Sequence, residues 1–233
     1  MKKIFASQPF LGKAEIDAVN VALSRNEISG FAGDFIGKFE STFASYCDCA
    51  SGVTVSSGTT ALHLALVALG IKQNDEVLVS TLTNMATFFA VLYQGAMPVP
   101  IDIEADTLNM DPALLESKIT PKTRAILAVH LFGHPVDMDP VNDIAKKYNL
   151  AVVEDCAEAH GALYKGKKVG SLSDAGCFSF YANKIITTGE GGMMDTQKNV
   201  TYRYVDDERV IVPSEMVRVV RKSTDEAVEI ICN

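Results

Sequence analysis

A lysine occupies a position where its amine can act as a nucleophile. Lys184 follows the apolar run Cys177–Phe180 and precedes the glycine-rich stretch Gly189–Gly192. Partial burial between a strand and a tight turn favours the neutral amine, which attacks carbonyl groups to form a Schiff base. Most lysines are solvated surface residues, but the neighbouring Asn183, Thr187 and Thr188 do not fit a plain surface turn. Lys184 is therefore predicted to bond covalently to a carbonyl compound.

A carboxylate follows a second apolar run. Asp155 comes directly after Val152-Val153-Glu154, where an unpaired charge is costly to bury. A carboxylate in this position can keep the nitrogen of a pyridine ring protonated, which makes the ring an electron sink. An acid that caps the next element is the alternative interpretation, and the residue types leave both open.

Small residues separate a third strand-like run from an apolar helix. Ser56-Ser57-Gly58-Thr59-Thr60 places backbone N–H groups at the positive end of the helix dipole, which suits an anion. Gly58 permits a close approach of the backbone. A plain N-cap by Ser57 or Thr59 is a commoner use of such a segment, so this motif alone is a weak signal.

The elements that position these residues alternate between strands and helices over about residues 52–196. Predicted strands cover 52–55, 76–79, 98–102, 125–129, 151–154 and 177–180, and predicted helices cover 60–69, 86–93, 112–119 and 141–148. Apolar strands without alternation indicate a mainly parallel sheet covered on both faces, an α/β fold. Ligands of such sheets bind at the carboxyl ends of the strands, where Ser56, Asp155 and Lys184 fall.

Composition limits the partners. Lys and Arg total 21 against 29 Asp and Glu, a net charge of -8, which argues against nucleic acid or an anionic membrane. One phosphate can still be held by backbone amides. The 5 scattered cysteines suit reduced thiols in the cytoplasm. His130, His134 and His160 lack the spacing of metal ligands, and His63 lies in an apolar helix that favours a packing role. We expect no metal, no signal peptide and no membrane span.

Three sequence motifs follow one another along the chain. They are Ser57-Gly58-Thr59-Thr60-Ala61-Leu62, then Glu154 to Gly161, then Cys177 to Lys184 with Gly189-Glu190-Gly191-Gly192. Together they resemble the DegT/DnrJ/StrS-type nucleotide-sugar aminotransferases, which use pyridoxal 5'-phosphate (PLP), and the last motif is most similar to perosamine synthase-like members. The resemblance runs from about Pro9 to Met194. It implies the large domain of the type I, aspartate aminotransferase-like fold.

The resemblance also implies roles for individual residues. Lys184 matches the lysine that holds PLP as a Schiff base and moves the proton, and Asp155 matches the partner of the ring nitrogen. Glu158 matches the residue facing the ring hydroxyl, which is often Gln. The remaining matches are the phosphate ligands Ser179, Gly58, Thr59 and Thr60. Tyr181 and Asn183 are candidates for substrate contact, and a packing role is the alternative for Tyr181. Asn84 stands where relatives commonly place an aromatic ring over the cofactor.

The implied reaction moves an amino group from an amino acid, glutamate in the family, to a nucleotide-linked 4-keto-6-deoxy sugar. The family setting is lipopolysaccharide or O-antigen biosynthesis by a cytoplasmic homodimer. Relatives that act as dehydratases carry His in place of the lysine, so Lys184 favours amino transfer.

Family members are longer than this chain. The segment Asp195–Asn233 has no match, so we expect a PLP-binding domain over 1–196, with an N-terminal arm over about 1–30. A divergent charged tail over 197–233 would follow, and the small C-terminal domain would be largely missing. Two alternatives remain: an inactive paralogue with weak or no PLP binding, and a type I enzyme acting on amino acids alone, such as a desulfurase.

Overall fold

The structure is a computed structural model that describes residues 9–29 and 33–198, together with the backbone of strands at 200–205, 208–213, 217–220 and 229–232. Within these residues, no helix is both long and apolar enough to cross a bilayer.

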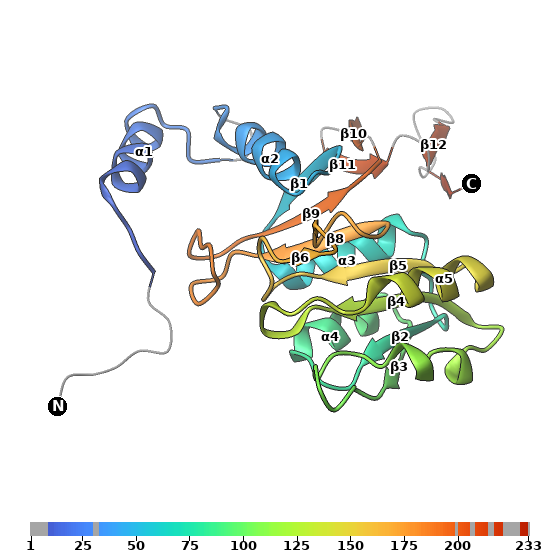
Figure 1. The fold of residues 1–233 in the computed structure, drawn as a ribbon. Coiled ribbons are helices and arrows are strands. Elements are labelled where there is room, and N and C mark those ends of the chain that lie inside the picture. Colours follow the sequence, from blue (N-terminus) through green and yellow to red (C-terminus); the bar gives the residue numbers. More distant parts are fainter. Residues whose placement is uncertain are drawn as a thin grey trace.

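A single seven-stranded sheet organises the molecule (Figure 1). Its strands, in spatial order, are β1 (Ser51–Val55), β9 (Gly192–Thr196), β8 (Ala175–Ser179), β5 (Ala151–Asp155), β4 (Thr123–Val129), β2 (Glu76–Ser80) and β3 (Met97–Ile101). Strand β9 runs antiparallel to both of its neighbours, and the pairs from β8 to β3 are parallel. The mainly parallel α/β sheet predicted from the sequence is confirmed.

Helices cover both faces of this sheet. On one face lie α3 (Gly58–Ala68) and α4 (Met85–Tyr93), and on the other lie α2 (Phe35–Tyr46) and α5 (Met138–Tyr148). Strand β4 shows why its sequence lacks alternation. Ala125 and Leu127 enter the core under α3 and α4, whereas Ile126 and Ala128 enter the core under α5. Both faces of the strand are buried, so both need apolar side chains.

The N-terminal helix differs from the others. Helix α1 (Lys13–Ser24) contains no buried residue, although Ile16, Val19 and Leu23 place apolar side chains on it. Figure 1 shows it standing apart from the sheet.

The β3 edge of the sheet carries two prolines. Pro98 and Pro100 pair with Val77 and Val79 of β2 and have no N–H group to offer to a further strand. Alternate prolines therefore discourage edge-to-edge association here.

The segment 112–119 corrects one prediction. It forms two 3₁₀ turns, η1 (Pro112–Leu114) and η2 (Glu116–Lys118), instead of one α-helix. Asp111 caps the first of these turns, because its Oδ1 accepts a hydrogen bond from Ala113 N at 2.9 Å. Only Pro112 and Leu115 are fully buried in this segment, so little packing supports a longer helix.

Short hairpins complete the described chain. A small one joins β6 (Leu163–Tyr164) to β7 (Lys167–Lys168), and the backbone beyond residue 199 pairs β10 (Val200–Val205) with β11 (Glu208–Pro213). A third pairs β12 (Val217–Val220) with β13 (Glu229–Cys232).

Candidate functional site

The turn before α3 presents an anion site built from backbone. Ser57 caps the helix: its Oγ accepts from Thr60 N at 3.2 Å, while its own N donates to Thr60 Oγ1 at 2.9 Å. The N–H group of Thr60 is thus committed to the cap. The N–H groups of Gly58 and Thr59, in the same first turn, have no acceptor within the helix and can meet an anion.

Close packing holds this turn against the sheet. A Cβ atom added at Gly58 would lie 2.7 Å from Ser179 Cβ, and one added at Gly192 would lie 2.3 Å from Ser57 O. Both distances are too short for any side chain. The glycines therefore let the turn contact the ends of β8 and β9 directly, which brings Ser179 beside Gly58.

Asp155, the last residue of β5, is almost fully buried. Its Oδ2 accepts a hydrogen bond from Thr87 Oγ1 at 2.8 Å, and its Oδ1 accepts one from Ala157 N at 3.1 Å. Burial raises the pKa of this carboxyl group above its ordinary value, and the two hydrogen bonds act in the opposite direction. An acid held in this way is ready to pair with a cation in the pocket.

Lys184 lies in the turn that follows β8. Its N donates to Tyr181 O at 2.9 Å, and its side chain is only 17% exposed, as expected from the sequence. The Nζ atom is 4.0 Å from Glu158 Oε1. The other oxygen of Glu158 accepts from Phe132 N at 3.2 Å. Glu158 is therefore anchored to the backbone on one side and faces the lysine on the other.

These elements enclose one pocket of about 270 Å³ at the carboxyl ends of β1, β5 and β8. Seven of the predicted residues line it: Gly58, Thr59, Asp155, Ser179, Tyr181, Asn183 and Lys184. Thr60 and Glu158 do not line it. Other lining residues are Ser57, Leu62, Asn84, Ala86, Ala157 and Glu190.

Asn84 occupies the pocket wall as the N-cap of α4. Its Oδ1 accepts from Ala86 N at 2.9 Å, so the amide is engaged in starting the helix. An aromatic side chain at this position could not make that bond. The capping role accounts for an Asn where stacking is expected.

Sequence reasoning missed Thr87, which touches Asp155 from α4. The two residues are 68 positions apart in the chain, and a threonine inside an apolar helix carries no sign of its partner. Thr83, four residues earlier, shares a 2.7 Å hydrogen bond with Thr87, and this i, i+4 spacing is the one available hint.

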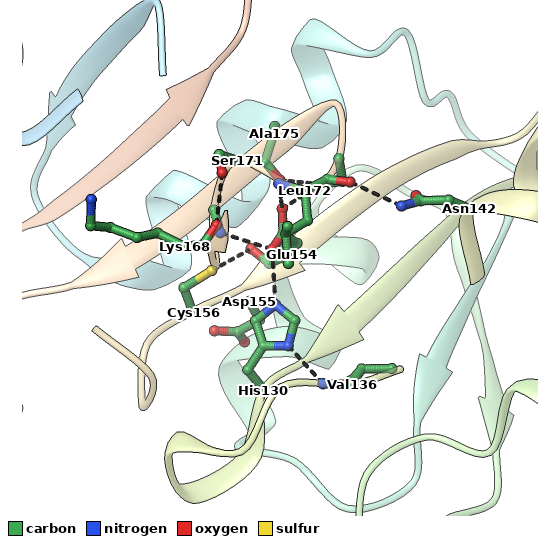
Figure 2. A network of polar contacts seen from close by, with 12 residues as sticks. His130, Val136, Asn142, Glu154, Asp155, Cys156, Lys168, Ser171, Leu172 and Ala175 are labelled. Carbon is green, nitrogen blue, oxygen red and sulfur yellow. Dashed lines mark hydrogen bonds and ion pairs between the residues drawn. The ribbon is translucent and has the colours of Figure 1, made fainter. Parts of the chain in front are cut away.

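A second buried polar network, centred on His130 and Glu154, lies beside Asp155 (Figure 2). His130 Nδ1 accepts from Val136 N at 3.1 Å, so the ring proton is on Nε2, which donates to Glu154 Oε2 at 2.9 Å. The Glu154 carboxylate also accepts from Gly170 N, Leu172 N and Ser173 Oγ at 2.8–2.9 Å. Both of its oxygens thus receive two hydrogen bonds each.

This network contains three groups close enough to share a metal ion, His130, Glu154 and Cys156. Both histidine nitrogens and both carboxylate oxygens already have partners, and burial raises the pKa of the Cys156 thiol well above its ordinary value. The network is better suited to bracing the loop 170–173 against β4 and β5 than to binding a cation.

His160 is a further buried ring beside the site. It lies 5.4 Å from Phe178 and 5.5 Å from Phe180 between ring centroids, and neither ring nitrogen has a side-chain or backbone hydrogen bond of normal geometry. Burial lowers its pKa to about 4, so the ring is neutral at physiological pH.

Comparison with known proteins identifies the family. The sequence pattern of the DegT/DnrJ/EryC1/StrS aminotransferase family matches residues 9–208. A GDP-perosamine synthase of Caulobacter vibrioides is 50% identical over 196 residues, which cover 84% of this chain and 53% of that protein. The chain spans about half the length of the curated relatives it matches.

Solved structures agree. An aminotransferase from Psychrobacter cryohalolentis matches with a TM-score of 0.81 and 42% identity, over 83% of this chain and 49% of that one. A GDP-4-keto-6-deoxymannose-3-dehydratase with a trapped PLP-glutamate geminal diamine matches with a TM-score of 0.79 and 29% identity, over 84% of this chain and 52% of that one. The motifs, the sheet and the pocket with its lysine thus lead to one conclusion: the chain belongs to the DegT/DnrJ/EryC1/StrS aminotransferase family.

Proposed function

We propose that the protein transfers an amino group from an amino acid, glutamate, to a nucleotide-linked 4-keto-6-deoxy sugar, with PLP as cofactor. One observation carries the proposal: Lys184, Asp155 and the N-terminus of α3 surround a single pocket of about 270 Å³. Similarity to a GDP-perosamine synthase supports the sugar class, and a related dehydratase trapped with PLP and glutamate supports the donor.

The pocket residues fit PLP. Gly58 and Thr59 offer backbone N–H groups for the phosphate, and Ser179, held against Gly58, offers a hydroxyl. Asp155 is a buried acid on the pocket wall, the type of group that pairs with a protonated ring nitrogen. When bound, PLP supplies an aldehyde for the amine and a ring that accepts electrons from the substrate carbon.

Each site residue has its own role in the proposed reaction. Lys184 would hold the cofactor through its aldehyde group and would carry a proton to and from the reacting carbon. Asp155 keeps the ring nitrogen protonated, and Glu158 fixes the position of Lys184 from behind. Tyr181 and Asn183 lie at the exposed mouth of the pocket, where we place the sugar.

A second copy of the chain is part of the proposal. Helix α4 exposes one apolar face, formed by Met85, Phe89, Leu92 and Tyr93, directly after the pocket residue Asn84. Among the described residues that line the pocket Lys184 is the sole cation, although the cofactor phosphate and the donor carboxylate are both anionic. We infer that a partner subunit covers α4 and adds positive charge. Phe89→Glu should then lower the sedimentation coefficient of the protein.

Domain limits and location are proposed on the same basis. We assign PLP binding to residues 1–196, with an arm over about 1–30, and treat 197–233 as a separate tail. Four cysteines, Cys47, Cys49, Cys156 and Cys177, are free thiols, which fits a reducing compartment such as the cytoplasm.

Cofactor attachment tests the proposal. The purified chain should develop a visible absorption band with PLP, and borohydride should fix the cofactor on Lys184, as located by peptide mass spectrometry. Lys184→Ala should lose the band, whereas Lys118→Ala, at an exposed lysine, should keep it. A band that persists in Lys184→Ala would exclude the assignment.

Donor specificity separates amino transfer from the alternative. Glutamate should convert the bound cofactor to its amine form, with loss of the visible band and release of 2-oxoglutarate. A band that forms at Lys184 but ignores every amino donor would favour an inactive PLP-binding paralogue.

A further inference from the structure

We propose that Thr87, itself oriented by Thr83, is a positioning residue that aims the Asp155 carboxylate into the pocket and stabilises its charged form. The inference rests on the proposed function, because it assigns to Asp155 the task of pairing with the cofactor ring nitrogen. It adds two hydroxyl groups from a different element, helix α4 and the residues before it.

The direction of the hydrogen bonds can be worked out. A carboxylate has no proton to give, so Thr87 Oγ1 must donate to Asp155 Oδ2, at 2.8 Å. The single proton of Thr87 is then used, and its 2.7 Å contact with Thr83 must take its proton from Thr83. The two hydroxyls form a one-way chain that ends on the carboxylate.

The position of Thr87 makes its hydrogen bond to Asp155 hard to replace. Thr87 is fully buried in the first turn of α4, so water cannot take its place as donor. Ala157 N donates a hydrogen bond to the other carboxylate oxygen, Asp155 Oδ1, at 3.1 Å. One donor from α4 and one from the loop after β5 therefore fix the plane of the carboxylate between two elements.

Charged and titratable groups near Asp155 define its electrostatic setting. Burial raises the pKa of Asp155 most strongly, and the hydrogen bond from Thr87, the one from Ala157 N and the nearby Lys184 act in the opposite direction. The neighbouring thiols Cys156 and Cys177 have raised pKa values and stay neutral. Without the Thr87 hydroxyl, Asp155 would hold a proton up to a higher pH and would pair less well with a ring cation.

The test compares Thr87→Val, which keeps the shape and removes the hydroxyl, with Thr87→Ser, which restores it. Thr87→Val should weaken PLP binding about tenfold, the effect of one hydrogen bond to a charged group. In the cofactor-free protein, ¹³C NMR of the Asp155 carboxyl should show a higher pKa in Thr87→Val and a return toward wild type in Thr87→Ser. Thermal melts report whether each variant is folded.

Thr83→Val covers the case in which Thr87→Val does not fold. It removes the outer hydroxyl from a partly exposed position and should shift both measurements in the same direction by a smaller amount. Wild-type PLP affinity and an unchanged Asp155 titration in the folded variants would overturn the inference. If wild-type protein attaches no PLP at Lys184, the proposed function fails instead, and the NMR titration still decides the role of Thr87.

Discussion

Lys184 Nζ lies 4.0 Å from Glu158 Oε1, and Glu158 itself is tied to the backbone of Phe132. Phe132 adopts a left-handed conformation, with φ of 50°, in the short turn η3 (Leu131–Gly133). Glu158, which does not line the pocket, therefore orients Lys184 from outside it. The hydrogen bond from the strained backbone at Phe132 fixes Glu158 in turn.

Glu158→Gln tests the electrostatic part of this arrangement. The amide oxygen can still accept from Phe132 N, but one negative charge next to an anion-binding pocket is lost. PLP affinity should rise by several-fold, roughly what a like charge beyond direct contact costs. Fluorescence titration at low and high salt measures this, with Asp106→Asn, at an exposed acid, as the control. Equal affinities for Glu158→Gln and wild type would show that the charge does not reach the cofactor.

Gly58→Ala should damage the phosphate cup. Its Cβ would lie 2.7 Å from that of Ser179, so the turn or β8 must move. We expect a loss of about 1–3 kcal/mol in the free energy of unfolding and weaker PLP binding.

The matched control for this change is Gly37→Ala, in α2. Apart from its own helix, an added Cβ there meets no atom of the described residues within 4 Å, and Ala favours a helix by about 1 kcal/mol over Gly. Chemical denaturation should therefore give opposite signs for the two variants. A neutral or stabilising Gly58→Ala would contradict the close packing at the site.

Whether a feature of the site can be predicted from the sequence depends on how far apart in the sequence the contacting residues lie. Strands and helices follow from local apolar runs, and the motif residues Gly58, Asp155 and Lys184 meet because parallel strands end at one edge. The α-helix predicted at 112–119 is wrong because packing there supports only two 3₁₀ turns. The contact of Thr87 with Asp155 bridges distant segments with no local pattern, so the structure alone reveals it.

Glu154→Gln should be the most destabilising conservative change near the site. All four hydrogen bonds to this fully buried carboxylate come from donors, so an amide would point its own N–H₂ group at two of them. We expect a loss of about 3–5 kcal/mol in the free energy of unfolding, as for other buried charges that lose a partner. Thermal denaturation measures it against Glu116→Gln, at an exposed acid. Similar melting temperatures for the two variants would contradict the proposed bracing role.

Asp195, in β9, should make the protein less stable as pH rises. Neither carboxylate oxygen has a hydrogen bond of normal geometry within the described residues. Burial raises the pKa of Asp195 from 3.8 to about 7, and the nearby Cys47 thiol has a smaller, opposite effect. Between these two values the unfolded chain has lost the proton and the folded chain keeps it, so increasing pH favours unfolding. The full cost is present above about pH 7, where the folded state also loses the proton.

Asp195→Asn removes this titration. The variant should match wild type near pH 4 and exceed it by about 1–3 kcal/mol at pH 8, by urea denaturation across the pH range. Asp106→Asn should show no such dependence. A stability difference that stays constant from pH 4 to pH 8 would mean that Asp195 is ionised in the folded protein throughout.

Strand β9 has a consequence for the order of events during synthesis. In the described sheet β1 bonds only to β9, so β1 joins the other strands only after residues 192–196 leave the ribosome. The part of the sheet formed by β5, β4, β2 and β3 can pair before β9 is made, because its strands lie within residues 76–155. The phosphate end of the pocket is therefore completed after this part of the sheet, and the nascent chain gains the complete pocket only once β9 has been made.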